Sequence, residues 1–160
     1  VLHPGAGGQS FYDVAGGGGN NTIIASIQGI FNGLTIDGGT GGLNTLQWNS
    51  AANLDLSTNG NAPASQIHNI DVLDFGSAAA QNHANQLTLN VTDVLSVGHG
   101  SSTLLVKGEA SVDSVHFADS GWVDSGPVSL NGVGYEQYTN GAAHVDIQNG
   151  MGVDMGLAAK

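Results

Sequence analysis

The sequence contains no cysteine and no arginine, and its only basic side chains are Lys107 and Lys160. Against these two cations stand 13 acidic residues, which give a formal net charge of −11. Binding to nucleic acid depends on cations that neutralise phosphates, and binding to anionic membranes depends on basic patches, so we expect no nucleic-acid partner, and an anionic membrane surface is disfavoured. A cysteine-free chain also lacks the disulfides that stabilise many extracellular domains. Divalent cations held by its carboxylates are the alternative that we expect.

Long hydrophobic runs are also missing. No apolar stretch reaches the roughly 18 residues that a membrane-spanning helix needs, so we expect no transmembrane segment. No basic stretch followed by an apolar one stands at the N-terminus as it does in a cleaved secretion signal. We interpret residues 1–12 as an arm or linker, 13–150 as the folded domain and 151–160 as a C-terminal tail.

Glycine is abundant, at 26 of 160 residues, and separates short runs in which apolar and polar residues alternate. Alternation with a period of two is typical of half-buried strands, and helix-length apolar patterns are absent between the runs. The fold is therefore predicted to be all-β. The predicted strands are Thr22–Ala25, Leu43–Trp48, Leu54–Leu56, Ile70–Phe75, Gln86–Asn90, Thr103–Val106, Ser114–Phe117, Tyr135–Tyr138 and His144–Ile147.

We expect these strands to stack in chain order as a parallel, solenoid-like β-roll or β-helix with glycine-rich turns. An antiparallel β-sandwich is the alternative, because Asn140-Gly141 between two runs is a typical hairpin turn. Two short helices are expected between strands, at Ser77–Ala84 and at Val91–Val97, the second with Thr92 as a capping residue for its first turn.

Two glycine-rich loops carry the most specific motif. Gly16–Ile23 fits the calcium-binding nonapeptide G-G-x-G-x-D-x-U with Asn21 at the aspartate position, and Asp37–Leu46 fits it with one extra residue and Asn44 at that position. Glycine allows sharp turns that aim carbonyl oxygens at a cation, and Asn keeps one oxygen but loses the charge. The alternative is a pair of plain tight turns. The candidate Ca²⁺ ligands are Asp13, Gly17, Gly19, Asn21, Asp37, Gly39, Gly41 and Asn44.

An ordered series of segments over about residues 14–150 resembles the C-terminal module of giant bacterial adhesins of the repeats-in-toxin type. This resemblance implies export by a type I route into a calcium-rich exterior, and it implies no catalysis. The segments are Ile36–Gly41, Asn44–Leu46, His68–Phe75, Ala84–Leu95, Ser102–Gly108, Asp113–Val115, Gly121-Trp122, Asn131–Tyr138 and Ala143–Ile147.

The function expected from these observations is that of a calcium-dependent structural or adhesive module of a secreted bacterial surface or matrix protein. Apolar stretches at both termini suggest end-to-end self-association into a filament or lattice. A carbohydrate-binding module is the alternative, with Trp48 and Trp122 as sugar-stacking residues. A polysaccharide-degrading enzyme is less favoured, because arginine is absent and Lys107 is the only internal lysine. We therefore expect no enzymatic activity. The six histidines show no metal-ligand spacing.

Overall fold

A computed structural model describes residues 14–25, 35–57, 60, 63–76, 83–98 and 102–156. The described chain is built from strands, with one α-helix, α3 (Val91–Val97), and one short 3₁₀ helix, η1 (Ala64–Gln66), so the all-β prediction is confirmed. The strands are β1 (Val14–Ala15), β2 (Thr22–Ala25), β3 (Ile36–Asp37), β4 (Thr45–Trp48), β5 (Leu54–Asp55), β6 (Ile67–His68), β7 (Val72–Asp74), β8 (Gln86–Leu89), β9 (Thr103–Lys107), β10 (Ser114–Phe117), β11 (Val123–Leu130), β12 (Val133–Asn140), β13 (Ala143–Gln148) and β14 (Gly152–Asp154).

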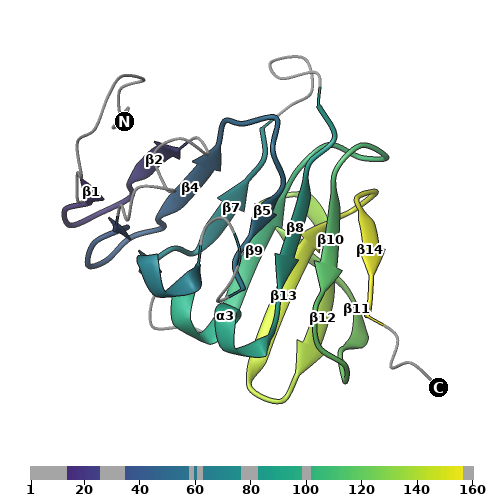
Figure 1. Ribbon diagram of the computed structural model, residues 1–160. Helices are drawn as coiled ribbons and strands as arrows, with labels where there is room; N and C mark the ends of the chain where they lie inside the picture. Colours follow the sequence, from purple (N-terminus) through teal and green to yellow (C-terminus); the bar gives the residue numbers. More distant parts are fainter. Residues whose placement is uncertain are drawn as a thin grey trace.

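The strands form three sheets, which the chain visits in a repeating order. Figure 1 shows β2, β4 and β7 side by side in one of these sheets. The three-stranded sheet has the order β1-β3-β6, the four-stranded sheet β14-β10-β8-β5, and the seven-stranded sheet β11-β12-β13-β9-β7-β4-β2. Thus β3, β4 and β5 lie in three different sheets, and β6, β7 and β8 lie in the same three sheets in the same order. We call each such passage of the chain through the sheets a turn of the chain. In the next turn α3 stands between β8 and β9, where the earlier turns have a strand of the three-stranded sheet.

Parallel pairing dominates, as the sequence predicts, but the predicted stacking order is partly wrong. The runs at Thr22–Ala25 and Leu43–Trp48 do pair in parallel as β2 and β4. The run at Gln86–Asn90, expected between the strands that became β7 and β9, lies instead in the four-stranded sheet, and β7 pairs directly with β9. The reason is that successive runs along the chain enter different sheets.

The hydrophobic core consists of rows of similar residues that lie in register across the turns. In the seven-stranded sheet the row Ile23, Leu46, Leu73 and Val106 is at most 1% exposed at every position. In the four-stranded sheet Leu54, Leu87 and Val115 form an equivalent row with 0% exposure. Because side chains alternate between the two faces of a strand, each strand adds one such residue to a continuous interior.

The helix α3 is capped by Asn90 and not by Thr92, which corrects the predicted cap. The Asn90 side chain accepts a hydrogen bond from Asp93 N at 3.0 Å, and Asp93 Oδ2 accepts one from Asn90 N at 2.9 Å. This reciprocal capping box satisfies two backbone N–H groups that would otherwise lack partners. Of the other expected helix, Ser77–Ala84, only residues 83 and 84 lie within the described residues, and they are not helical.

Antiparallel pairing is confined, within the described part of the chain, to the strands β11 to β13. The predicted Asn140-Gly141 turn joins β12 to β13, which pair antiparallel from Asn140↔Ala143 to Tyr135↔Gln148. A second hairpin, turning at Asn131-Gly132, adds β11 at the edge of the seven-stranded sheet. That edge is interrupted by Pro127 and by a register shift between Asp124 and Gly126. Both are devices that keep an edge strand from pairing with another chain.

Of the two predicted terminal segments, the structure describes only part of the C-terminal tail. The arm at residues 1–12 lies outside the described residues. Part of the predicted tail forms β14, which pairs in parallel with β10 through Ser114↔Gly152, Val115↔Val153 and His116↔Asp154. The hydrogen bond between His116 Nδ1 and Asp154 Oδ2, 2.9 Å long, joins the two strands on the surface and lowers the pKa of Asp154.

Candidate functional site

The two glycine loops lie one above the other, at equivalent places in successive turns of the chain. Each loop connects a strand of the three-stranded sheet to a strand of the seven-stranded sheet, β1 to β2 and β3 to β4. Backbone hydrogen bonds join the turns on both sides of the loops: Gly16 N donates to Asp37 O at 2.7 Å, and Thr45 N donates to Asn21 O at 2.8 Å. The stacking brings the predicted ligands of both loops together.

Glycine is required in these loops because the backbones pass very close to one another. A Cβ atom on Gly38 would lie 2.0 Å from Asn69 O in the following turn, and one on Gly39 would lie 2.3 Å from Gly17 O. Gly39 also has a φ of +92°, which side chains other than glycine rarely adopt. Gly19 and Gly41 share that left-handed conformation, at +88° and +98°.

The side-chain amide nitrogen of Asn21 lies at the centre of the stacked loops, among four oxygen atoms. Three are the carbonyl oxygens of Gly17, Gly19 and Gly38, at 3.1, 2.9 and 3.0 Å. The fourth is Asn44 Oδ1, at 3.0 Å. An amide group carries only two protons, so the four acceptors share them. If the amide were turned over, its own oxygen would face these four oxygens, and the surroundings therefore fix its orientation.

Asn44 continues this arrangement into the next turn. Its side chain is completely buried, and its Nδ2 donates to Gly39 O at 3.3 Å. Its backbone N donates to Asp71 Oδ2 at 2.8 Å. The strand residues Thr22, Thr45 and Val72 are paired in register. Each is preceded by a polar residue, and we name this set of two amides and one carboxylate, Asn21, Asn44 and Asp71, the amide ladder.

Asp37 lies beside the amide ladder and accepts hydrogen bonds from neighbouring amide groups. Its Oδ1 accepts hydrogen bonds from Gly39 N and from Asn69 Nδ2, each at 2.8 Å. Asp13, the other predicted acidic ligand, lies outside the described residues. Of the eight predicted ligands, the structure therefore brings Gly17, Gly19, Asn21, Gly39 and Asn44 into direct contact, with Asp37 at the side. Gly41 contributes a left-handed turn.

Three polar residues of this region were missed by the sequence interpretation: Asn20, Asn69 and Asp71. Asn20 Oδ1 accepts a hydrogen bond from Leu43 N at 2.7 Å and so links the two loops. Asn69 and Asp71 belong to a third turn that contains no glycine cluster. Asp71 could have been found from its position in the sequence, because it stands directly before its strand as Asn44 does.

In the described part of the chain, the stacked loops direct carbonyl oxygens, and no carboxylate, at the space around Asn21 Nδ2. Calcium takes six to eight oxygen ligands, which are carboxylates together with backbone and Asn carbonyls and water, at about 2.3–2.6 Å. The four oxygens around Asn21 Nδ2 all belong to neutral groups, and they lie at hydrogen-bonding distances from a nitrogen atom that fills the space between them. The nearest ladder carboxylate, Asp71, accepts from Asn44 N. Among the described residues no three His, Cys, Asp or Glu side chains gather closely enough to hold a metal ion.

A second buried asparagine closes a turn in the same way at the four-stranded sheet. Asn85, 2% exposed, donates from Nδ2 to Ser50 O at 2.9 Å and to Ala52 O at 3.0 Å, both in the preceding turn. Its backbone N donates to Asp113 Oδ1 at 2.9 Å in the following turn. The use of side-chain amides to join turns is thus not limited to the glycine loops.

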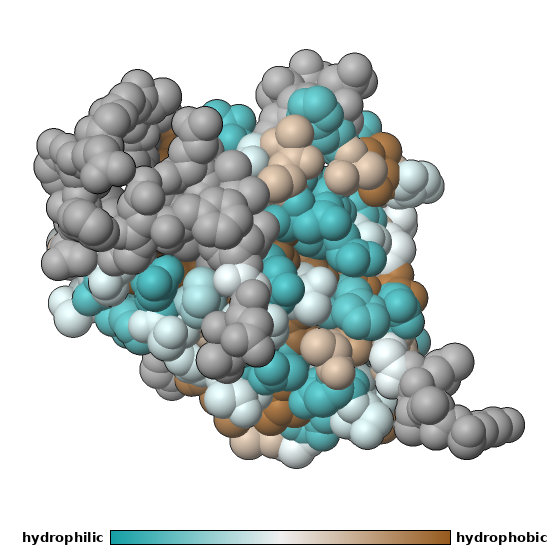
Figure 2. Space-filling view, in the orientation of Figure 1, coloured by the Kyte–Doolittle hydropathy of each residue, from teal (hydrophilic) through white to brown (hydrophobic). Residues whose placement is uncertain are grey.

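The two tryptophans proposed as sugar-stacking residues are part of the core. Trp48 is 1% exposed and donates from Nε1 to Ala52 O, and Trp122 is 4% exposed. Trp122 stacks on Phe117 with ring centroids 4.2 Å apart and donates to Asp119 Oδ1 at 2.7 Å. Neither ring offers a free face to a glycan. In Figure 2 the coloured part of the visible surface is a mixture of hydrophilic residues with small separate hydrophobic areas.

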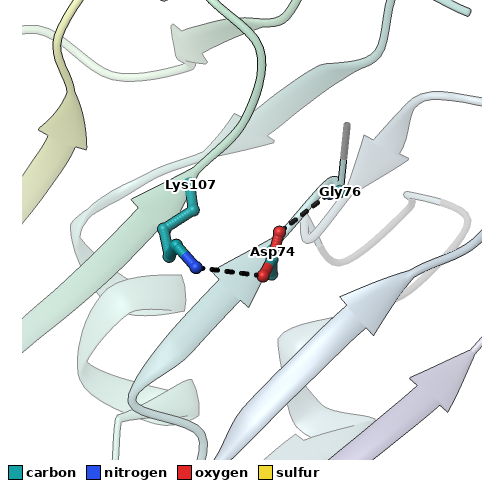
Figure 3. Close-up of polar contacts among 3 residues, drawn as sticks. All are labelled: Asp74, Gly76 and Lys107. Carbon is teal, nitrogen blue, oxygen red and sulfur yellow. Dashed lines mark hydrogen bonds and ion pairs between the residues drawn. The ribbon is translucent and has the colours of Figure 1, made fainter. Parts of the chain in front are cut away.

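The charges of the described residues are almost all negative, and one ion pair involves Lys107. Its Nζ, on β9, lies 3.2 Å from Asp74 Oδ2 on the adjacent strand β7, while Asp74 Oδ1 accepts from Gly76 N at 2.8 Å (Figure 3). Both side chains are partly exposed, so the pair contributes at most about 1 kcal/mol.

Asp93 is a buried carboxyl at the first turn of α3. Burial raises its pKa from 3.8 to about 6, against the opposing effect of its hydrogen bond from Asn90 N. Repulsion from the carboxylates of Asp55 and Asp119 adds to the rise. The group serves as a cap and lies away from the glycine loops.

Comparison with known proteins adds no relative. A scan against protein-family models, a search of curated proteins and a search of solved structures each found no match to this chain. Within the described residues no helix is both long and apolar enough to cross a membrane.

Proposed function

We propose that this chain is a structural module of a secreted bacterial surface or extracellular matrix protein, and that its turns stack as a parallel, β-helix-like scaffold. The observation that carries the proposal is the register of equivalent residues: Ile23, Leu46 and Leu73 follow one another in the core, and the amide ladder follows beside them. A stack in which each turn contacts only its neighbours is suited to holding other domains at a distance.

The extracellular location rests on the sequence. The resemblance to repeats-in-toxin adhesins implies export by a type I route. The chain is cysteine-free and carries a net charge of −11. The same charge favours solubility and disfavours non-specific association. Calcium dependence of the whole module stays a prediction of the sequence, and no step of the structural proposal depends on the ion.

The structural role is favoured over carbohydrate binding because the two tryptophans that would stack on a sugar are buried. We propose no catalytic step. End-to-end self-association also stays a prediction. Pro127 and the register shift interrupt the hydrogen-bonding pattern of β11, which disfavours its free edge as the contact surface.

The test is an in-frame replacement in the bacterium that makes the protein. One strain lacks residues 14–156, and a second carries in their place an unrelated folded domain of similar length. If the chain is a structural module, the bacterial cells should lose attachment in the deletion strain and recover it in the strain with the unrelated domain. If the unrelated domain fails to restore attachment while a glycan array detects binding by the isolated chain, the module binds a ligand and the structural proposal is wrong. Detection of the protein only inside cells would contradict the extracellular assignment.

A further inference from the structure

We infer that the side-chain amides of Asn21 and Asn44 take the place that a calcium ion takes in glycine loops of the G-G-x-G-x-D type, so that these two turns are held together without the ion. The inference concerns how the turns are stabilised and does not rest on the proposed function. It also differs from the sequence prediction, which placed Ca²⁺ among these residues.

Three backbone carbonyl groups converge on one point of the stacked loops. Gly17, Gly19 and Gly38 direct their oxygens from two successive turns at one point, with Asn44 Oδ1 alongside. Converging carbonyl oxygens repel one another unless a positive group lies between them. Here that group is the Asn21 NH₂, within 2.9–3.1 Å of all four oxygens. The amide therefore fills both the space and the electrostatic role of a cation.

The same hydrogen bonding continues into the next turn. Asn44 is completely buried, receives the Asn21 amide on its oxygen and donates from its nitrogen to Gly39 O. A buried polar side chain is costly unless it is hydrogen-bonded, and the bonds of Asn44 meet this requirement with protein groups alone. A neutral amide adds no charge, so two of them stack without repulsion.

Aspartate at the same two positions would not be compatible with this arrangement unless a cation were present. Asn21 Nδ2 and Asn44 Oδ1 are 3.0 Å apart, so aspartate at both positions would bring two negative charges about this close together. The carboxylate at position 21 would also face the three carbonyl oxygens, with no proton between them. Like charges this close are strongly unfavourable without a cation between them. Asn→Asp at both positions should therefore create the calcium dependence that the native residues remove.

The experiment compares thermal unfolding of the full chain in excess EDTA and in millimolar calcium, followed by circular dichroism. The variants are the native chain, Asn21→Asp/Asn44→Asp, and the control Asn131→Asp/Asn149→Asp, which adds the same charge at two exposed turns, after β11 and after β13. The measured quantity is the shift of the unfolding midpoint caused by calcium. We expect the shift of the loop variant to exceed those of the native chain and the control by about 5–10 °C, the size that a few kcal/mol produces in a chain of this length.

A calcium-induced shift of the loop variant that is no larger than that of the native chain would overturn the inference. Comparison with the native chain removes the effect of any calcium bound elsewhere. If the double variant folds in calcium but not in EDTA, the inference is supported. If it folds in neither, the single variant Asn21→Asp decides by the same comparison, because Asn21 is only partly buried and tolerates the change better.

Discussion

Replacement of Asp93 by Asn should abolish a loss of stability that the native chain suffers as the pH rises from about 4 to about 6. The folded state raises the pKa of Asp93 from 3.8 to about 6, so over this range it binds a proton that the unfolded chain has released. Stability then falls with rising pH, because deprotonation of the folded form places a charge in a buried site. Below pH 4 both states are protonated and the penalty vanishes.

The size of the effect follows from the shift. A difference of about 2 pKa units sets an upper limit of about 3 kcal/mol, since each unit is worth about 1.4 kcal/mol and solvent screening lowers the energy actually gained. The Asn side chain keeps an oxygen that can accept from Asn90 N, so the cap itself should survive the substitution. Above pH 7 the variant should therefore be more stable than the native chain, by less than this limit.

Urea unfolding at a series of pH values measures the prediction. The other carboxylates also repel one another at higher pH, so the informative quantity is the difference between native and variant curves. Asp124→Asn, which removes one charge from the exposed strand β11, is the matched control and should raise stability only slightly. A native chain and an Asp93→Asn variant with parallel pH profiles would show that burial of this carboxyl carries no energetic penalty, and the reasoning would be refuted.

Three further substitutions test the packing, the cap and the sheet edge. Leu46→Ala should lower the free energy of unfolding by about 2–5 kcal/mol because Leu46 is 0% exposed, whereas Leu43→Ala, at 52% exposure, should change it by less than about 0.5 kcal/mol in the same urea titration. Asn90→Ala should cost about 1 kcal/mol by the same measurement, and no loss would contradict the capping role. Pro127→Thr should increase association measured by light scattering, because it restores a backbone N–H on β11; unchanged mass would argue against edge protection.

The sequence predicts the positions of most strands because their apolar and polar residues alternate. Each of the nine predicted runs contains or lies within a strand of the structure. The strand β11 was not predicted, since Val123–Leu130 combines a Gly-Pro pair with exposed polar residues. It forms because the Asn131-Gly132 turn folds it onto β12. The two-residue strands β1, β3 and β6 are too short to show a pattern.

The assignment of strands to sheets was beyond the sequence for a different reason. A run such as Gln86–Leu89 reads as a strand whichever sheet receives it, and only the geometry of the intervening turns directs it to the four-stranded sheet. Likewise, the loop motif identified Asn21 and Asn44 as equivalent residues, yet it did not reveal which end of each amide faces the carbonyl groups. That depends on how closely the two turns approach.

The helix α3 has a consequence for how this molecule can vary in length. It packs against β6, and Ile70 N, just after that strand, donates to Val97 O at the end of the helix at 2.9 Å. A helix offers no open ladder of backbone groups to a further strand. Duplication of a whole turn between β1 and β6 would preserve the contacts of α3. The same duplication after β6 would separate α3 from β6. Lengthening by gene duplication should therefore be tolerated on one side of this helix only.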